Sequence, residues 1–260
     1  MSLEAHATTA PAVEQTTPQP RHSRWVRSTH WVVTIAFAIL AFTGFIILRA
    51  HPRLYWGEAG NDLTPALLEL PISRNYKHGG WTNTTPFFAQ ADSPVSASRT
   101  IGIYNQNSWG RSLHFLSAWI LVLTGIAYFL PGIISGHFRR NLLPGKNELS
   151  TQGLWTDFKE HLRFKIRSAT GGPQYGLLQK LSYFIVIFIA LPLTGITGLA
   201  MSPAVTASYP FVSGAFGGFQ SARTIHFVLS LLLALFLIVH VLMIILSGFK
   251  RQMRAMTIGE

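Results

Sequence analysis

Four long apolar stretches dominate the pattern of hydrophobic and polar positions, at 29–48, 112–134, 178–201 and 222–247. Each holds about 20 residues or more, which is enough for a helix to cross the hydrocarbon core of a bilayer. A segment in lipid must satisfy its own backbone hydrogen bonds, and a helix does so. The pattern therefore predicts an all-α integral membrane protein, a four-helix transmembrane bundle occupying 21–250.

Polar segments flank and separate these four spans. Residues 1–20 are polar and rich in Pro and Thr, which predicts a disordered tail and not a signal peptide. Residues 251–260 form a second tail. The connections are a long loop at 49–108, a basic loop at 135–177 and a short one at 202–219.

Some of these segments carry weaker local patterns. The pieces 63–71 and 82–90 of the long loop are compatible with short surface helices or turns. Alternating basic and apolar residues at 152–168 favour an interfacial amphipathic helix, with an ordinary basic loop as the alternative. Pro192 should kink the third span.

The formal net charge of +11 raises the question of a nucleic-acid partner. Lys and Arg are concentrated before the first span, in 135–177 and after the last span, and none occurs in 202–219. This is the positive-inside distribution for four spans with both termini cytoplasmic. The charge thus reflects topology in a bacterial inner membrane, with lipid as the surrounding partner, and does not indicate nucleic acid.

The chain contains no cysteine. This excludes disulfides, a cysteine-ligated iron–sulfur cluster and the covalent attachment of c-type haem. Any haem would be held by coordination and packing alone, which points to haem b.

Four histidines lie in or at the ends of the apolar stretches. His226 and His240 share the last span and stand fourteen residues apart. A helix returns them to nearly the same face, about 40° apart, at levels about 21 Å apart. In the predicted topology, His114 lies level with His226 near the outer surface, and His30 level with His240 near the inner one. Two bis-histidine haems would use these four residues as axial ligands.

Any one intramembrane histidine could instead be a helix–helix hydrogen-bond partner or an end residue. The joint placement of the four favours the ligand interpretation. The other histidines fall in tails, loops or a span end, where we expect them to be solvated; they are residues 6, 22, 51, 78, 137 and 161.

Arginine precedes three of the four histidines by three residues, at Arg27, Arg111 and Arg223. On a helix this spacing places both side chains on one face, so each guanidinium could pair with haem propionates. Arg27 can also be explained as an ordinary charge flanking a span on the cytoplasmic side. Arg111 and Arg223 lie on the outer side, where the positive-inside rule does not explain them. Gly44 and Gly125 fall at the levels of the outer and inner haems, where a porphyrin needs close backbone approach.

The motif R-x-x-H-W at Arg27–Trp31, the histidine opening the second span and H-x13-H in the last resemble the prokaryotic cytochrome b561 family. That family includes the di-haem b subunits of hydrogenase and formate dehydrogenase. The stretches 179–183 and 193–203 are similar to cytochrome b subunits that accompany molybdenum-cofactor oxidoreductases. The resemblance covers about 21–250 and implies a quinone site near one haem and a peripheral redox partner near the other.

We therefore expect an electron relay between a quinone pool and a periplasmic redox subunit, which the long loop 49–108 would dock. A stand-alone redox enzyme of the same fold, acting on superoxide or another small oxidant, is one alternative. A transition-metal transporter is another, but transporters normally add intramembrane carboxylates, and the four spans contain no Asp or Glu.

Overall fold

The computed structural model describes residues 22–61, 64–73, 76, 107–143, 155, 159 and 177–259. The predicted tail at 1–20, the piece 82–90 and all but Trp155 and Lys159 of the predicted helix at 152–168 lie outside these residues.

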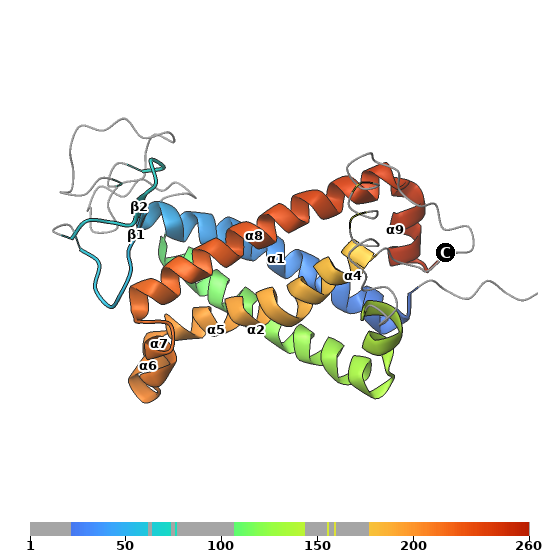
Figure 1. The fold of residues 1–260 in the computed structure, drawn as a ribbon, viewed down its shortest axis with the longest axis horizontal. Coiled ribbons are helices and arrows are strands. Elements are labelled where there is room, and N and C mark those ends of the chain that lie inside the picture. Colours follow the sequence, from blue (N-terminus) through green and yellow to red (C-terminus); the bar gives the residue numbers. More distant parts are fainter. Residues whose placement is uncertain are drawn as a thin grey trace, which may run out of the picture.

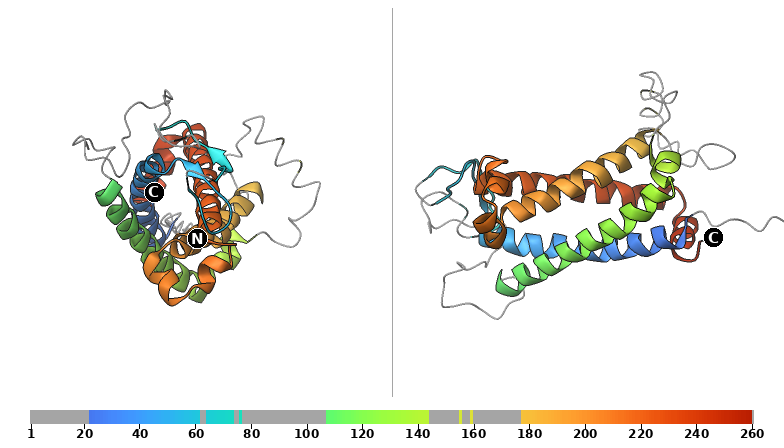
Figure 2. Two further views of the ribbon diagram at one scale, coloured as in Figure 1. Left: turned by 90° about the vertical axis from the view of Figure 1, so that its left-hand side faces the viewer. Right: turned by 90° about the horizontal axis from the view of Figure 1, so that it is seen from below.

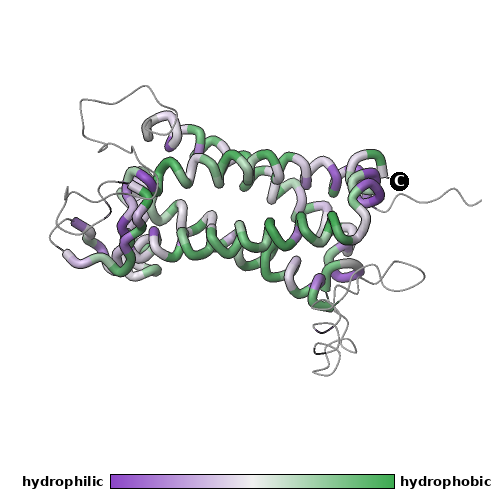
Figure 3. The backbone as a smooth tube through the Cα atoms, turned by 90° about the horizontal axis from the view of Figure 1, so that it is seen from above, coloured by the Kyte–Doolittle hydropathy of each residue, from purple (hydrophilic) through white to green (hydrophobic). Residues whose placement is uncertain are grey.

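Helices long and apolar enough to cross a membrane number four in the described part of the chain. They run from Arg24 to Ala50, from Trp109 to Ile134, from Leu177 to Ala200 and from Phe219 to Leu246. The predicted all-α membrane bundle is confirmed, and each span keeps its predicted place with ends shifted by a few residues. Hydrophobic residues fill the length of the bundle and polar residues gather at its two ends (Figure 3).

In chain order the elements are as follows. The first half comprises α1 (Arg24–Ala50), β1 (Arg53–Leu54), β2 (Leu68–Glu69), α2 (Asn107–Ile134) and the π-helix η2 (Phe138–Leu142). The second half comprises α4 (Leu177–Phe184), the π-helix η3 (Ile185–Ala190), α5 (Leu191–Ala200), α6 (Pro203–Ser208), α7 (Phe211–Gly214), α8 (Phe219–Leu246) and α9 (Phe249–Thr257).

The spans associate as two helix pairs. Among the described residues, close packing between spans joins α1 to α2 and α5 to α8. The two pairs lie beside each other along the bundle (Figure 2, right). Side chains such as Leu123 and Ile238 are 62% and 65% exposed, as expected for residues that face lipid.

The two ends of the bundle carry different small elements (Figure 1). One end, called here the outer end, holds the β1–β2 pair and α6 with α7. The other, the inner end, holds η2, α4, α9 and the start of α1. The first and last described residues therefore lie at the same end, as an even number of spans requires.

Several local expectations differ from the structure. The piece 63–71, predicted as short surface helices or turns, reaches a turn at Pro71 but also supplies β2, which pairs antiparallel with β1. The short loop 202–219 contains α6 and α7, and the predicted tail 251–260 contains α9. Residues 135–143, predicted as loop, continue α2 through a turn into η2. Its Phe138 packs against Gly132, where a Cβ would collide with the ring.

The third span is irregular where proline was expected to disturb it. The π-helix η3 ends at Ala190, two residues before Pro192. Proline has no N–H to donate to the carbonyl four residues earlier, and its ring crowds that carbonyl. A π-helical turn is one way for a helix to absorb this mismatch, and α5 then continues to Ala200.

Candidate functional site

Two pairs of imidazoles face each other across the bundle. The ring centroids of His114 on α2 and His226 on α8 are 6.4 Å apart. Those of His30 on α1 and His240 on α8 are also 6.4 Å apart. These are the two pairs that the sequence predicted from the depth of each histidine in the membrane. One pair lies toward each end of the bundle.

This spacing fits an iron atom between the two rings. A metal–imidazole bond is about 2 Å long and the ring centre lies about 1 Å beyond the nitrogen, so two collinear bonds separate the centres by roughly 6 Å. Within the described residues, no group of three or more His, Cys, Asp or Glu could hold a metal ion. Two neighbouring imidazoles with no further protein ligand among these residues suit a porphyrin, which would supply the other iron ligands itself.

The imidazoles of the outer pair are held by hydrogen bonds at Nδ1. Nδ1 of His114 lies 2.9 Å from the hydroxyl oxygen of Thr43 on α1. That hydroxyl donates its own hydrogen to the Ile39 carbonyl at 2.7 Å, so its oxygen accepts from Nδ1–H. His114 is therefore protonated on Nδ1, and its Nε2 keeps the lone pair that a metal requires.

His226 has the same arrangement on the other helix pair. Its Nδ1 lies 3.1 Å from the hydroxyl oxygen of Thr197 on α5 and 3.0 Å from the Thr194 carbonyl. The Thr197 hydroxyl donates to the Leu193 carbonyl at 2.9 Å and so accepts from the imidazole. Both outer rings thus offer Nε2.

Glycine follows each of these threonines. A Cβ on Gly44 would lie 3.5 Å from Cε1 of His114, and a Cβ on Gly198 would lie 3.5 Å from Cε1 of His226. The predicted level of Gly44 is thus correct, since it lies against the outer pair. A Cβ on Gly125 would meet no described atom within 4 Å, so its predicted role is not tested by a contact.

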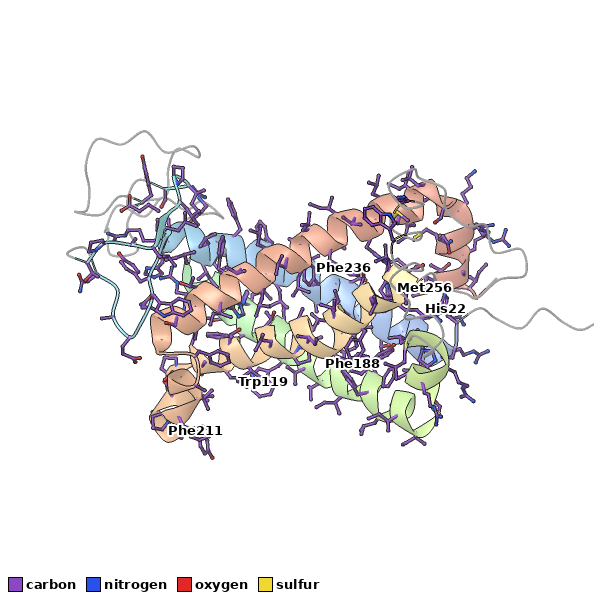
Figure 4. The ribbon with its side chains drawn as sticks, in the orientation of Figure 1. His22, Trp119, Phe188, Phe211, Phe236 and Met256 are labelled. Carbon is purple, nitrogen blue, oxygen red and sulfur yellow. The ribbon has the colours of Figure 1, made fainter. Side chains whose placement is uncertain are left out.

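Aromatic rings surround the inner pair. The ring of Phe236 stacks on His240 with centroids 5.7 Å apart and planes 20° apart, and Tyr183 of α4 lies 6.3 Å from the same imidazole. Figure 4 shows Phe236 on the face of α8 turned toward α4. The ring of Trp31 meets His30 edge-on at 5.6 Å. The buried Nδ1 of His30 has no hydrogen-bond partner among the described residues.

Guanidinium groups gather at the outer end. Arg223 donates to the carbonyl of His51, the residue that ends α1, and to Oε1 of Gln220 at 3.4 Å. Although part of His51 is open to solvent, burial and then the charges of Arg223, Arg111 and Arg53 lower the pKa of its imidazole to about 4. Arg111 and Arg223, predicted to bind propionates, therefore lie together beside one neutral imidazole.

Arg27 lies at the inner end and is tied to the last helix. Its Nη1 donates to the Thr257 carbonyl of α9 at 3.1 Å. Its buried Nε has no partner in the part of the chain that the structure describes. Trp31 also reaches α9, since its Nε1 donates to the Met256 carbonyl at 3.0 Å. Arg27 thus has one donor available for an anionic group.

Sequence reasoning did not identify Thr43, Thr197, Gly198 or Arg49 as site residues. Arg49 is in the last turn of α1 and is 5% exposed. It lies toward the outer end of its span, against the positive-inside rule, but it does not precede a histidine by three residues as Arg111 and Arg223 do. The repeated Thr-Gly dipeptide was a further signal. His137, expected to be solvated, is half-buried, and its ring meets that of Trp25 at 5.3 Å.

Comparison with known proteins agrees with this geometry. The family model of prokaryotic cytochrome b561 matches residues 21–259. A putative protein-methionine-sulfoxide reductase subunit, YedZ1 of Azospira oryzae, is 25% identical over 225 residues, which cover 86% of this chain and 90% of the relative. No solved structure matches the chain.

Proposed function

The chain belongs to the prokaryotic cytochrome b561 family, and on this premise we propose that it is a di-haem subunit relaying electrons between membrane quinone and a periplasmic redox partner. Membership of the family implies a multi-pass protein of the bacterial inner membrane that binds haem b and transfers electrons. The number of haems, their ligands, the quinone and the partner are the proposal.

Four histidines would hold two haems. His114 and His226 would ligate the outer haem, and His30 and His240 the inner one. The equal spacing of 6.4 Å in both pairs is the observation that carries this assignment. When bound, haem b supplies a one-electron redox centre, and ligation by two imidazoles would leave no open iron position for oxygen or substrate.

Cationic side chains would bind the haem propionates. At the outer end Arg111 and Arg223 would take this role, together with Arg49, which is buried in the last turn of α1. At the inner end the free Nε of Arg27 is the available donor. Guanidinium pairs bidentately with carboxylate, which makes arginine the suitable residue for this contact.

The quinone site would lie at the inner end. Arg27 and Trp31 stand beside His30 and are the candidate contacts. Their hydrogen bonds to the Thr257 and Met256 carbonyls mean that α9 forms one wall of that site. A quinone would pack against Trp31 and the Arg27 side chain, while Nε of Arg27 serves the haem propionate.

The redox partner would bind at the outer end. There the segments next to β1 and β2 expose apolar side chains, with Trp56 62% and Leu67 64% exposed. The relative is named as a subunit of a protein-methionine-sulfoxide reductase, which supports a separate catalytic subunit for this chain too. The resemblance to cytochromes that accompany molybdenum-cofactor oxidoreductases favours a partner of that class.

Haem stoichiometry tests the proposal. A pyridine-haemochrome assay on the purified protein should give about two b haems per chain. His240→Ala should lose the inner haem and keep the outer one, because only one of the two pairs is broken, and His226→Ala should do the reverse. Two full haems in either variant would contradict the assignment. Quinol added to the intact protein should reduce the haems in wild type.

A further inference from the structure

The outer imidazoles are supported by two copies of one local arrangement. In each, a helix carries Thr-Gly, and the other helix of the same pair carries the histidine: Thr43-Gly44 of α1 with His114 of α2, and Thr197-Gly198 of α5 with His226 of α8. A Cβ on either glycine would lie 3.5 Å from Cε1 and 3.9 Å from Nδ1 of its ring. The two histidines lie in different helix pairs. Each contacts its Thr-Gly across a different helix interface, yet the glycine–imidazole distances are the same.

Each threonine side chain is held in place by its own helix, independently of the imidazole. Both side chains are fully buried, with 0% exposure. Each hydroxyl donates back to carbonyls of its own helix, at Ile39 for Thr43 and at Leu193 for Thr197. The oxygen lone pair that remains is directed at Nδ1–H of the histidine. The hydrogen bond therefore selects one tautomer and one ring orientation, while the adjacent glycine lets the ring lie against the helix backbone.

The inner pair has no such support among the described residues. Nδ1 of His30 is buried without a partner, and His240 is positioned by the rings of Phe236 and Tyr183. The planes of the two outer rings cross at 62°, those of the inner rings at 49°. The two sites thus differ in what fixes the ligands, although their spacing is the same.

We propose that Thr43 and Thr197 are positioning residues that hold the axial imidazoles of the outer haem and lower its reduction potential relative to a site without them. This rests on the proposed function, because it takes the four histidines as ligands. A hydrogen bond accepted from Nδ1–H makes an imidazole a more basic ligand. A more basic ligand stabilises the oxidised iron, so the potential falls. The same bond holds the angle between the ring planes.

The test removes the hydroxyl and keeps the shape. Thr197→Val deletes the hydroxyl acceptor of His226 Nδ1–H and leaves the Thr194 carbonyl as its second acceptor, and Thr197→Ser restores the hydroxyl. The matched control is Thr194→Val on the same helix, because the Thr194 hydroxyl donates only to the Ala190 carbonyl in the described structure, and the carbonyl that contacts His226 is unchanged. Redox titration monitored by absorbance and low-spin EPR spectra of the full-length protein report each haem separately.

We expect Thr197→Val to raise the midpoint potential of one haem and shift its EPR g values, with the second haem unchanged. The ratio of reduced to oxidised haem at a fixed potential should increase severalfold; a tenfold increase corresponds to about 59 mV. Thr197→Ser and Thr194→Val should match wild type. Loss of one haem from Thr197→Val but not from Thr194→Val also supports the role.

Thr43→Val tests the same claim through the other ring and should shift the same haem in the same direction. Two haems with wild-type potentials and g values in both valine variants would overturn the inference and leave the proposed function intact. Fewer than two haems in wild type would instead overturn the proposed function, and this inference with it.

Discussion

Arg223 shows at the scale of one residue how charge placement is tied to the outer site. It precedes His226 by three residues, and its guanidinium reaches back to the carbonyl that ends α1. It shares the surroundings of His51 with Arg111 and Arg53. Several guanidiniums of one sign in such proximity are costly unless an anionic group lies among them. The propionates of the outer haem are the group that the proposal supplies.

Replacing Arg223 with methionine should lower the midpoint potential of the outer haem or weaken its retention. A nearby positive charge favours the reduced form of the haem, and Arg223→Met removes that charge while keeping an unbranched side chain of similar length. The measurement is a redox titration with haem quantification. Arg24→Met, which removes an exposed charge at the inner end, serves as control. An unchanged outer haem would reduce Arg223 to a structural link with His51.

The sequence could place the four histidines because a helix converts residue spacing into depth. The spacing of fourteen positions from His226 to His240 is enough to define two levels, and the topology then pairs each histidine with a partner. The supports could not be derived in this way. The contact between Thr43 and His114 joins residues 71 positions apart, and only the packing of α1 on α2 determines which threonine meets the ring.

At the scale of elements, the chain after α1 forms a strap over the start of α8. The Gly57 carbonyl accepts from the amides of Gln220 and Ser221, and the Glu58 carboxylate accepts from the amide of Phe219 at 3.1 Å. The first amides of a helix have no partner within it and favour a negative charge. The strap therefore caps α8 a few residues before His226. The first part of the predicted docking loop is thus hydrogen-bonded to the start of α8.

Gly218, directly before α8, makes the close approach of the strap possible. Its φ of 111° and ψ of 172° lie in a region that only glycine adopts readily. A Cβ there would also collide with the Glu58 carboxylate and the Gly57 backbone. Gly218→Ala should therefore lower the free energy of unfolding in detergent by about 1–3 kcal/mol. Gly214→Ala in α7 is the control, since its Cβ would meet no described atom within 4 Å, and it should leave thermal stability unchanged.

The long helices were predictable at this scale because hydrophobic length alone defines a membrane span. The strap and the β1–β2 pair could not be predicted, because the strands Arg53–Leu54 and Leu68–Glu69 have two residues each. Such short strands leave no periodic pattern. Pro192 did signal a disturbance, but not that it would take the form of a π-helix ending at Ala190.

At the scale of the whole molecule, two helix pairs contribute one imidazole each to the outer pair of histidines. His114 comes from the α1–α2 pair and His226 from the pair formed by α5 and α8. The inner pair again joins α1 to α8. Packing within each pair builds the Thr-Gly supports, whereas the approach between pairs sets the 6.4 Å spacing. The bundle thus separates the task of orienting the ligands from that of spacing them.

The proposed direction of the bundle decides which end meets the periplasmic partner. The absence of cysteine from the chain makes any introduced thiol unique. Leu67→Cys places it on the exposed β1–β2 segment, and Arg251→Cys places it on the exposed side of α9. With both termini cytoplasmic, a membrane-impermeant maleimide added to spheroplasts should label Leu67→Cys at once and Arg251→Cys only after permeabilisation. The reverse pattern would put the His114–His226 pair at the cytoplasmic side, and the quinone and partner would then have to exchange ends.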